Sequence, residues 1–366
     1  MEIKEKKVEL IELFYDLIYV YAISRLTLII ENPQMSVDRF FSYLVICFVI
    51  LQAWLYLTNY VNRYGEWKWY EYVLTSINMI ATLYMSNTIS ANWVDMALTF
   101  NIAMLIMLLC VGGMYLIQVI KKKNTRAAKN SLTILSIDYI LYFLAFLASL
   151  FHLSNLVIWL DGGAVLAGAF LPFFIRGHFD ASIISFPHLA ERFELITIIT
   201  FGEGIVGITD FFNVNHFSIK PILVFMIVLS LFGCYVVQIH LLCNHHRIDR
   251  ALRLMFSHYF IVIAINLITV SFKYIELHAN KLMIISIMFL STLLFFVSIF
   301  ANRVYYHQKY ELRTSDYIET GILFLIGGLI MLIFRTSDYG LLMGILFITG
   351  LNFIQLVKKY NGGTLS

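Results

Sequence analysis

Residues 280–300 read NKLMIISIMFLSTLLFFVSIF, in which Lys281 is the only charged residue. A helix of about 20 mostly apolar residues crosses the roughly 30 Å hydrocarbon core of a bilayer. Comparable stretches recur along the chain, and we interpret twelve of them as membrane spans, at about residues 8–29, 39–62, 68–90, 94–120, 131–152, 155–176, 188–211, 218–243, 251–272, 280–300, 316–335 and 338–357. The sequence therefore predicts an all-α, polytopic membrane protein.

The composition agrees with this fold class and excludes others. Hydrophobic residues make up 60% of the chain and charged residues 13%, whereas a soluble domain has about half and about a quarter. We therefore expect membrane lipids as neighbours and no nucleic acid as a partner, despite the net charge of +3. The four cysteines lie within apolar runs without a C-x-x-C pair, which indicates buried, reduced thiols. The sequence predicts neither a metal nor a cofactor.

The distribution of lysine and arginine predicts the orientation in the membrane. If the N-terminus is cytoplasmic, the cytoplasmic segments hold 19 of these residues and the external loops hold four. This excess matches the positive-inside rule. We therefore expect a multi-pass protein of the plasma membrane with both termini in the cytoplasm, and no cleavable signal peptide is evident.

The two halves of the chain resemble each other at a fixed offset. A shift of 178 residues places spans one to six on spans seven to twelve, and SIDYI at 136–140 falls on TSDYI at 314–318. Six spans per half keep both halves in the same orientation. We predict two parallel six-helix repeats, residues 1–178 and 179–366, related by a pseudo-two-fold axis along the membrane normal. The alternative is that short acidic–aromatic matches arise by chance at helix starts.

Ionisable side chains within the spans are the candidate functional residues. Each costs about 2.5–3.5 kcal/mol on insertion scales, so it is expected to face a partner or a wet cavity. The first and seventh spans carry most of them and should therefore be innermost. With their motif neighbours, the candidate substrate- or proton-binding residues are Glu12, Asp16, Arg25, Asp138, His188, Glu191, Arg192, Glu194, Gly202, Glu203, Gly204 and Asp316. We assign no catalytic residue and no metal ligand.

Four of the candidate carboxylates are predicted to lie at a similar depth in the membrane. Asp16, Asp138 and Glu194 each lie about seven residues inside the cytoplasmic end of a predicted span, and Asp316 is the repeat equivalent of Asp138. Carboxylates that share one level would repel, and one of them could hold a proton near neutral pH. Asp138 and Asp316 have a second interpretation as N-terminal helix caps. The sequence leaves both interpretations open.

The deepest charges are Arg25 and Glu203, which are equivalent under the offset. We expect them to pair if their helices flank the two-fold axis, because pairing relieves two burial costs. Glu203 lies in the glycine-rich run GEGIVG at 202–207. This run predicts either an interrupted helix that offers backbone groups to a substrate, or close packing between helices.

Two motifs resemble a known family. The run ELFYDL at 12–17 resembles the opening of the bacterial low temperature requirement A family, and the H-x-x-E-R run at 188–192, followed by Gly202-Glu203, resembles its second signature. The resemblance implies an integral membrane protein of bacteria linked to growth in the cold, with no settled substrate. The positions carried by both the motifs and the burial argument are Glu12, Asp16, Glu191, Arg192 and Glu203.

The chain departs from the family pattern at two places. The family usually has glycine where Glu194 stands and a neutral polar residue where Arg25 stands. These departures weaken a family-wide role for either residue.

Three functional hypotheses remain, and a secondary transporter of a small molecule or ion, with proton coupling as one form, leads them. Its support is the twelve spans, the predicted repeat and the buried acids, and the absence of a P-loop argues against direct drive by ATP. The second is an intramembrane lipid-modifying enzyme, with Glu191-Arg192 binding a headgroup. No metal-binding acidic motif supports it, so an enzyme is disfavoured. The third is a non-catalytic membrane-adaptation or assembly factor for growth in the cold.

Overall fold

The structure is a computed structural model that describes residues 6–31, 36–89, 93–121, 125–174, 183–212 and 218–364. Within these ranges the chain forms twelve long α-helices and no strand beyond an isolated bridge between Cys243 and Tyr306. The all-α class predicted from the sequence is confirmed. The chain divides into two compact units, the first of Met1–Arg192 with His246–Arg250, the second of Phe193–His245 with Ala251–Ser366.

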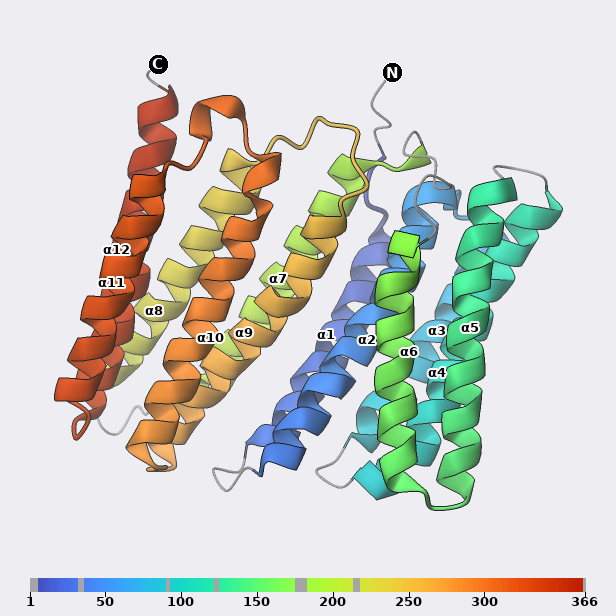
Figure 1. The fold of residues 1–366 in the computed structure, drawn as a ribbon, viewed down its shortest axis with the longest axis horizontal. Coiled ribbons are helices and arrows are strands. Elements are labelled where there is room, and N and C mark those ends of the chain that lie inside the picture. The colour runs from blue at the N-terminus through green and yellow to red at the C-terminus, as the bar shows by residue number, and fades with distance from the viewer. Residues whose placement is uncertain are drawn as a thin grey trace. The chain divides into compact units, whose positions relative to one another are not determined.

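Six helices and the beginning of a seventh build the first unit (Figure 1). They are α1 (Leu10–Ile30), α2 (Val37–Tyr64), α3 (Trp69–Thr88), α4 (Trp93–Ile120), α5 (Thr125–Leu150) and α6 (Ser154–Phe174). The helix α2 is central, because α1, α4 and α6 all pack on it. The other neighbours are α1 with α3, α3 with α4, α4 with both α5 and α6, and α5 with α6.

The helix α7 (Phe186–Gly207) supplies residues to both units, and five further helices complete the second. They are α8 (Lys220–Tyr235), α9 (Leu252–Glu276), α10 (Lys281–Ala301), α11 (Thr314–Ile333) and α12 (Asp338–Thr364). A π-helical segment, Val236–Leu242, continues α8. Here α12 is central and packs on α8, α10 and α11, while α9 packs on α10.

Three pairs of neighbouring helices in the first unit have counterparts in the second under the offset of 178 residues. The pairs α2/α6, α3/α4 and α5/α6 of the first unit have counterparts in α8/α12, α9/α10 and α11/α12 of the second. These pairings concern each unit by itself. The repeat symmetry and the division at residue 178 stay predictions.

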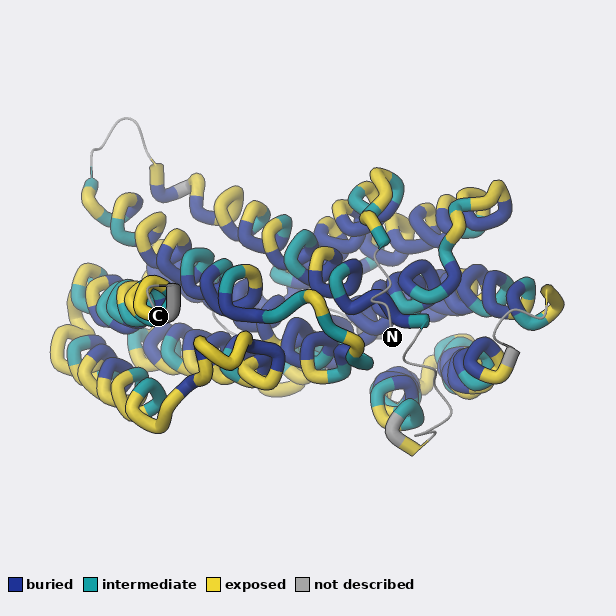
Figure 2. The backbone as a smooth tube through the Cα atoms, turned by 90° about the horizontal axis from the view of Figure 1, so that it is seen from above, coloured by how far each residue is buried: buried dark blue, intermediate teal, exposed yellow. Residues whose placement is uncertain are grey.

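Ten helices are long and apolar enough to span a membrane, which is consistent with a polytopic membrane protein. The two that do not qualify are α3 and α7, and α7 carries His188, Arg192 and three glutamates. Exposed stripes run along the helices (Figure 2), and many exposed side chains are apolar, as on α11 at Leu325, Leu329 and Ile333. Such faces suit contact with lipid. Among the candidate spans α9 is the most enclosed, whereas we expected the first and seventh spans to be innermost.

The helix boundaries correct one prediction. The fifth span was expected from about residue 131, but α5 begins at Thr125. Arginine, alanine and lysine favour helix, and Ala127 and Ala128 are buried, so the polar start of α5 packs as helix. Asp138 therefore lies more than three turns inside α5, which excludes the interpretation as a cap.

Candidate functional site

The two motif runs meet in the first unit through one pair of side chains on each helix. Glu12 and Asp16 are four residues apart on α1, and His188 and Arg192 are four residues apart on α7. This spacing places each pair on one helix face. All four residues are at most 1% exposed. We call Glu12, Asp16, His188 and Arg192 the charge cluster.

Arg192 is the centre of the charge cluster. Its guanidinium donates to both carboxylate oxygens of Asp16, with Nε at 3.0 Å from Oδ2, and also to Oε2 of Glu12. Guanidinium and carboxylate groups match each other in such forked geometry, which makes these hydrogen bonds strong and directional. Trp54 of α2 donates from Nε1 to Asp16 at 2.7 Å, and its ring faces the guanidinium at 5.6 Å. Among the described residues the hydrogen bonds to Asp16 all come from donors, which favours the ionised form of its carboxylate.

A third helix, α2, fixes the cluster from the side. Trp54, Thr58 and Asn62 follow one another at intervals of four residues and lie on one face of α2. Asn62 donates from Nδ2 to the carbonyl oxygen of Ser185 at 2.8 Å and accepts from its backbone N–H at 3.2 Å. Asn62 therefore ties the residue before α7 to α2.

The same asparagine determines the tautomer of His188. The backbone N–H of Ser185 can only donate and its carbonyl can only accept, so the amide of Asn62 has one possible orientation. Its Nδ2 then donates to Nδ1 of His188 at 3.0 Å. The imidazole carries its proton on Nε2, from which it donates to Oε2 of Glu12 at 3.0 Å. His188 is thus neutral in this arrangement.

The charges of the cluster do not sum to zero. Oε1 of Glu12 accepts from Nε1 of Trp67 at 3.3 Å, and Oε2 accepts from Arg192 and His188, so Glu12 is also ionised. Two carboxylates and one guanidinium leave a net charge of −1. Lys6 brings a further positive charge to the end of α2, where it donates to the carbonyl of Gly65 at 3.0 Å.

Sequence reasoning missed the contribution of α2. The signal was present as three side chains with hydrogen-bonding groups, Trp54, Thr58 and Asn62, at intervals of four residues in α2. Their partners come from helices distant in sequence, so the spacing alone does not reveal what they bind.

The predicted residues Glu191 and Glu194 of α7 lie outside the charge cluster. Glu191 is exposed. Glu194, in the second unit, accepts from Nδ1 of His240 at 3.0 Å and lies 3.6 Å from Nε2 of His245. His245 also approaches a helix end, since its Nε2 lies 2.8 Å from the carbonyl oxygen of Ile239.

The glycine-rich end of α7 remains helical. Gly204 lies against Thr269 of α9, where an added Cβ would be 3.0 Å from Oγ1, and Gly202 has open space around it. The helix is continuous through Gly207, so of the two interpretations left open the structure agrees with close packing, in which Gly204 takes part. Glu203 is half-buried.

Arg25 is half-buried on α1, and its Nε has no hydrogen-bond partner among the residues that the structure describes. It belongs to the first unit and Glu203 to the second. The Arg25–Glu203 pair stays a prediction.

The remaining predicted carboxylates, Asp138 and Asp316, lie at different places along their own helices, and the shared level of the four carboxylates stays a prediction. Asp138 is buried in the middle of α5, where it accepts from the hydroxyl of Tyr56. Asp316 lies in the first turn of α11 and accepts from the backbone N–H of Arg313 at 2.7 Å, so it caps that helix.

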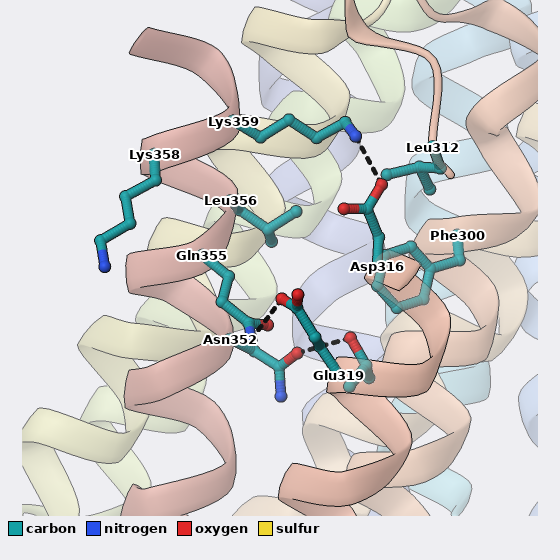
Figure 3. A pocket seen from close by; sticks show the side chains of 10 residues that line it. Phe300, Leu312, Asp316, Glu319, Asn352, Gln355, Leu356, Lys358 and Lys359 are labelled. Carbon is teal, nitrogen blue, oxygen red and sulfur yellow. Dashed lines mark hydrogen bonds and ion pairs between the residues drawn. The ribbon is translucent and has the colours of Figure 1, made fainter. Parts of the chain in front are cut away.

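Asp316 also lines a cavity of about 420 Å³ between α11 and α12 (Figure 3). Lys359 points toward Asp316 and pairs with it, whereas Lys358 points away. Deeper in the cavity Gln355 donates to Glu319 at 3.0 Å and Thr320 donates to Asn352 at 2.8 Å. The charged and amide groups that line the cavity thus pair mainly with one another. Within the described ranges no three His, Cys, Asp or Glu side chains converge as metal ligands would.

Comparison with known proteins agrees with the two motifs. Residues 7–351 match the family described as bacterial low temperature requirement A protein (LtrA). No curated protein and no solved structure matches the chain. The match covers nearly the whole sequence and includes all four residues of the charge cluster, so the chain belongs to the bacterial low temperature requirement A (LtrA) family.

Proposed function

We propose that this protein is a proton-coupled secondary transporter in which the charge cluster senses the proton. The observation that carries the proposal is the neutral His188, buried between Glu12 and Asn62 next to a carboxylate excess. An ionisable group inside a membrane-spanning protein is a functional candidate by default, because its burial is costly.

A proton on His188 would change both charge and geometry. It would bring the net charge of the cluster from −1 to zero. It would also place an N–H on Nδ1, where Asn62 now donates, and two donors cannot face each other. Asn62 cannot simply turn away, since both ends of its amide are bonded to Ser185. Protonation is therefore coupled to separation of α2 from the start of α7.

This coupling supplies what a carrier requires, namely two arrangements of helices that a bound ion selects. The lysine and arginine distribution supports a plasma-membrane protein with both termini in the cytoplasm, and we include that orientation in the proposal. The transported molecule would be a small molecule or ion.

An enzyme that uses Arg192 to bind a lipid headgroup receives less support. Arg192 is 1% exposed, and Asp16, Glu12 and Thr58 accept four hydrogen bonds from its guanidinium. A headgroup could reach it only after the cluster had opened.

The test measures proton flux into proteoliposomes that hold a pH-sensitive dye. The probe is a filtered extract of bacterial small molecules, added outside. We expect extract-dependent flux with the wild type and its loss in His188→Gln, because glutamine can donate to Glu12 and accept from Asn62 but does not titrate. His307→Gln, at an exposed histidine, is the matched control and should retain the flux.

Three outcomes would contradict the proposal. Full flux in His188→Gln would remove the charge cluster from the coupling. Modified lipid without flux would indicate the enzyme. Neither flux nor product, together with stable co-purification of a partner, would indicate the assembly factor.

A further inference from the structure

Two aspartates outside the charge cluster are buried in the first unit without a cation. Asp138 on α5 and Asp161 on α6 are both 0% exposed. Among the described residues Tyr56 is the only side chain hydrogen-bonded to Asp138, and Asn101 the only one hydrogen-bonded to Asp161. Neither partner carries a charge. A lone carboxylate in such a place is far costlier than a neutral acid.

The hydrogen bonds around Asp138 lack a donor for two buried oxygen atoms. The single hydroxyl proton of Tyr56 goes to Oδ2 of Asp138, so this hydroxyl must accept from Gln52, whose Nε2 faces it. The orientation of the Gln52 amide follows from that requirement. Oε1 of Gln52 and Oδ1 of Asp138 are then buried acceptors without a donor.

The surroundings of Asp161 have the same deficit. Asn101 donates from Nδ2 to the carbonyl of Ala97 at 2.9 Å, and a carbonyl can only accept, so the amide orientation is fixed. Its Nδ2 also lies 3.5 Å from Oδ2 of Asp161. Oδ1 of Asn101 and Oδ1 of Asp161 remain buried acceptors without a donor.

All four unsatisfied atoms at these two places are oxygens, and each place has one carboxyl group. One proton on each carboxyl group would cancel the charge and supply the O–H donor that is absent. We propose that Asp138 and Asp161 each bind an exchangeable proton, forming two proton-binding positions in the first unit, apart from the charge cluster.

The packing of α6 connects the two proposed proton-binding positions. Gly168 of α6 lies against Gln52, Tyr56 and Asp138, so α6 carries Asp161 and also closes the surroundings of Asp138. Gly168 is two turns from Asp161, about 10 Å along the axis. Arg63 of α2 does not pair with Asp138. It donates to Ser131 of α5, which lies two turns before Asp138. The inference deepens the proposed function by naming further proton sites, but its test requires no transport.

The test is infrared spectroscopy of the purified full chain near neutral pH, in ordinary and heavy water. A protonated carboxyl group has a carbonyl band that moves on deuteration, and an ionised one does not. We expect two such components in the wild type, of which Asp138→Asn removes one and Asp161→Asn the other. The matched control, Asp338→Asn, should leave both, because Asp338 pairs with Lys220 and Lys281.

Both asparagine variants should fold, since the new amide supplies the missing donor. If the asparagine variants fail to fold, a second pair of variants still tests the inference. Tyr56→Phe and Asn101→Leu keep each acid but remove its hydrogen bond, so each should shift one component without removing it.

The inference is overturned if the wild type has no such band, or if the band is unchanged in all four variants. If the band is missing and the protein unfolds at a higher temperature in sodium than in potassium, the sites bind a metal cation. Carboxyl bands without transport would contradict only the proposed function, and transport without the bands would contradict only this inference.

Discussion

At the scale of single residues, the charge cluster shows how a motif acts through hydrogen-bond direction. The i, i+4 spacing of Glu12 with Asp16 and of His188 with Arg192 was readable from the sequence. The identity of their partners was partly readable, because buried acids require a cation. The role of Asn62 was not, since it depends on the backbone of Ser185, which is 123 residues away.

Loss of the central arginine should destabilise the protein strongly. In Arg192→Met two carboxylates stay buried without their cation, and breaking a buried ion pair costs about 3–5 kcal/mol. Thermal unfolding in detergent measures the effect. Arg303→Met, at an exposed arginine, is the control and should change little. The triple variant Glu12→Gln, Asp16→Asn, Arg192→Met should recover much of the loss, and no recovery would mean that the charges are not its cause.

A methyl group at Gly168 should disturb the surroundings of Asp138. In Gly168→Ala the new Cβ would overlap Gln52 and Tyr56, and overpacking of this kind costs about 1–3 kcal/mol. Gly163→Ala, on the same helix, meets nothing within 4 Å and should be neutral or slightly stabilising, because alanine favours helix. Equal unfolding temperatures for the two variants would contradict the packing described for α6.

At the scale of helices, hydropathy predicted the elements well and their ends less well. The spans predicted to begin near residues 155 and 338 correspond to α6 and α12, which begin at Ser154 and Asp338. The sequence predicted the start of α5 too late, because Arg126, Lys129 and Asn130 lower the mean hydropathy of residues 125–130. The helix extends to Thr125 because Ala127 and Ala128 are buried against other helices, and hydropathy averaged along the sequence does not detect such burial.

The contact between α11 and α12 depends on two facing glycines. A Cβ at Gly327 would lie 2.8 Å from the backbone oxygen of Gly344, and the converse distance is also 2.8 Å. Gly344→Ala should therefore push the helices apart and lower the unfolding temperature, since small residues permit such close approach. Gly321→Ala, in open space on α11, is the control. A stable Gly344→Ala variant would show that the pair has room to adjust.

At the scale of the whole molecule, the sequence determines the class and the family. The two compact units have corresponding helix neighbours, and a parallel repeat remains the prediction that would explain them. An experimental map that relates α1–α6 to α7–α12 by an axis normal to the membrane would establish the repeat. Inverted halves would refute it.

Orientation can be tested with introduced thiols at Asn124 and Ser90, both of which lie outside the described residues. We expect an impermeant reagent outside the cell to label Ser90→Cys and to miss Asn124→Cys. The four native cysteines are buried and free, so they should add little background. Membrane permeabilisation should expose Asn124→Cys, and labelling of that site in intact cells would reverse the predicted topology.

The π-helical segment Val236–Leu242 has an evolutionary consequence. Because each of its hydrogen bonds encloses one more residue than in an α-helix, such a segment corresponds to a single-residue insertion. His240 lies within this segment and His245 follows it, and both lie near Glu194. In lineages with glycine at the position of Glu194, selection to keep that extra residue would be relaxed. Alignments of such relatives are expected to carry a one-residue gap within 236–242, accompanied by loss of the two histidines.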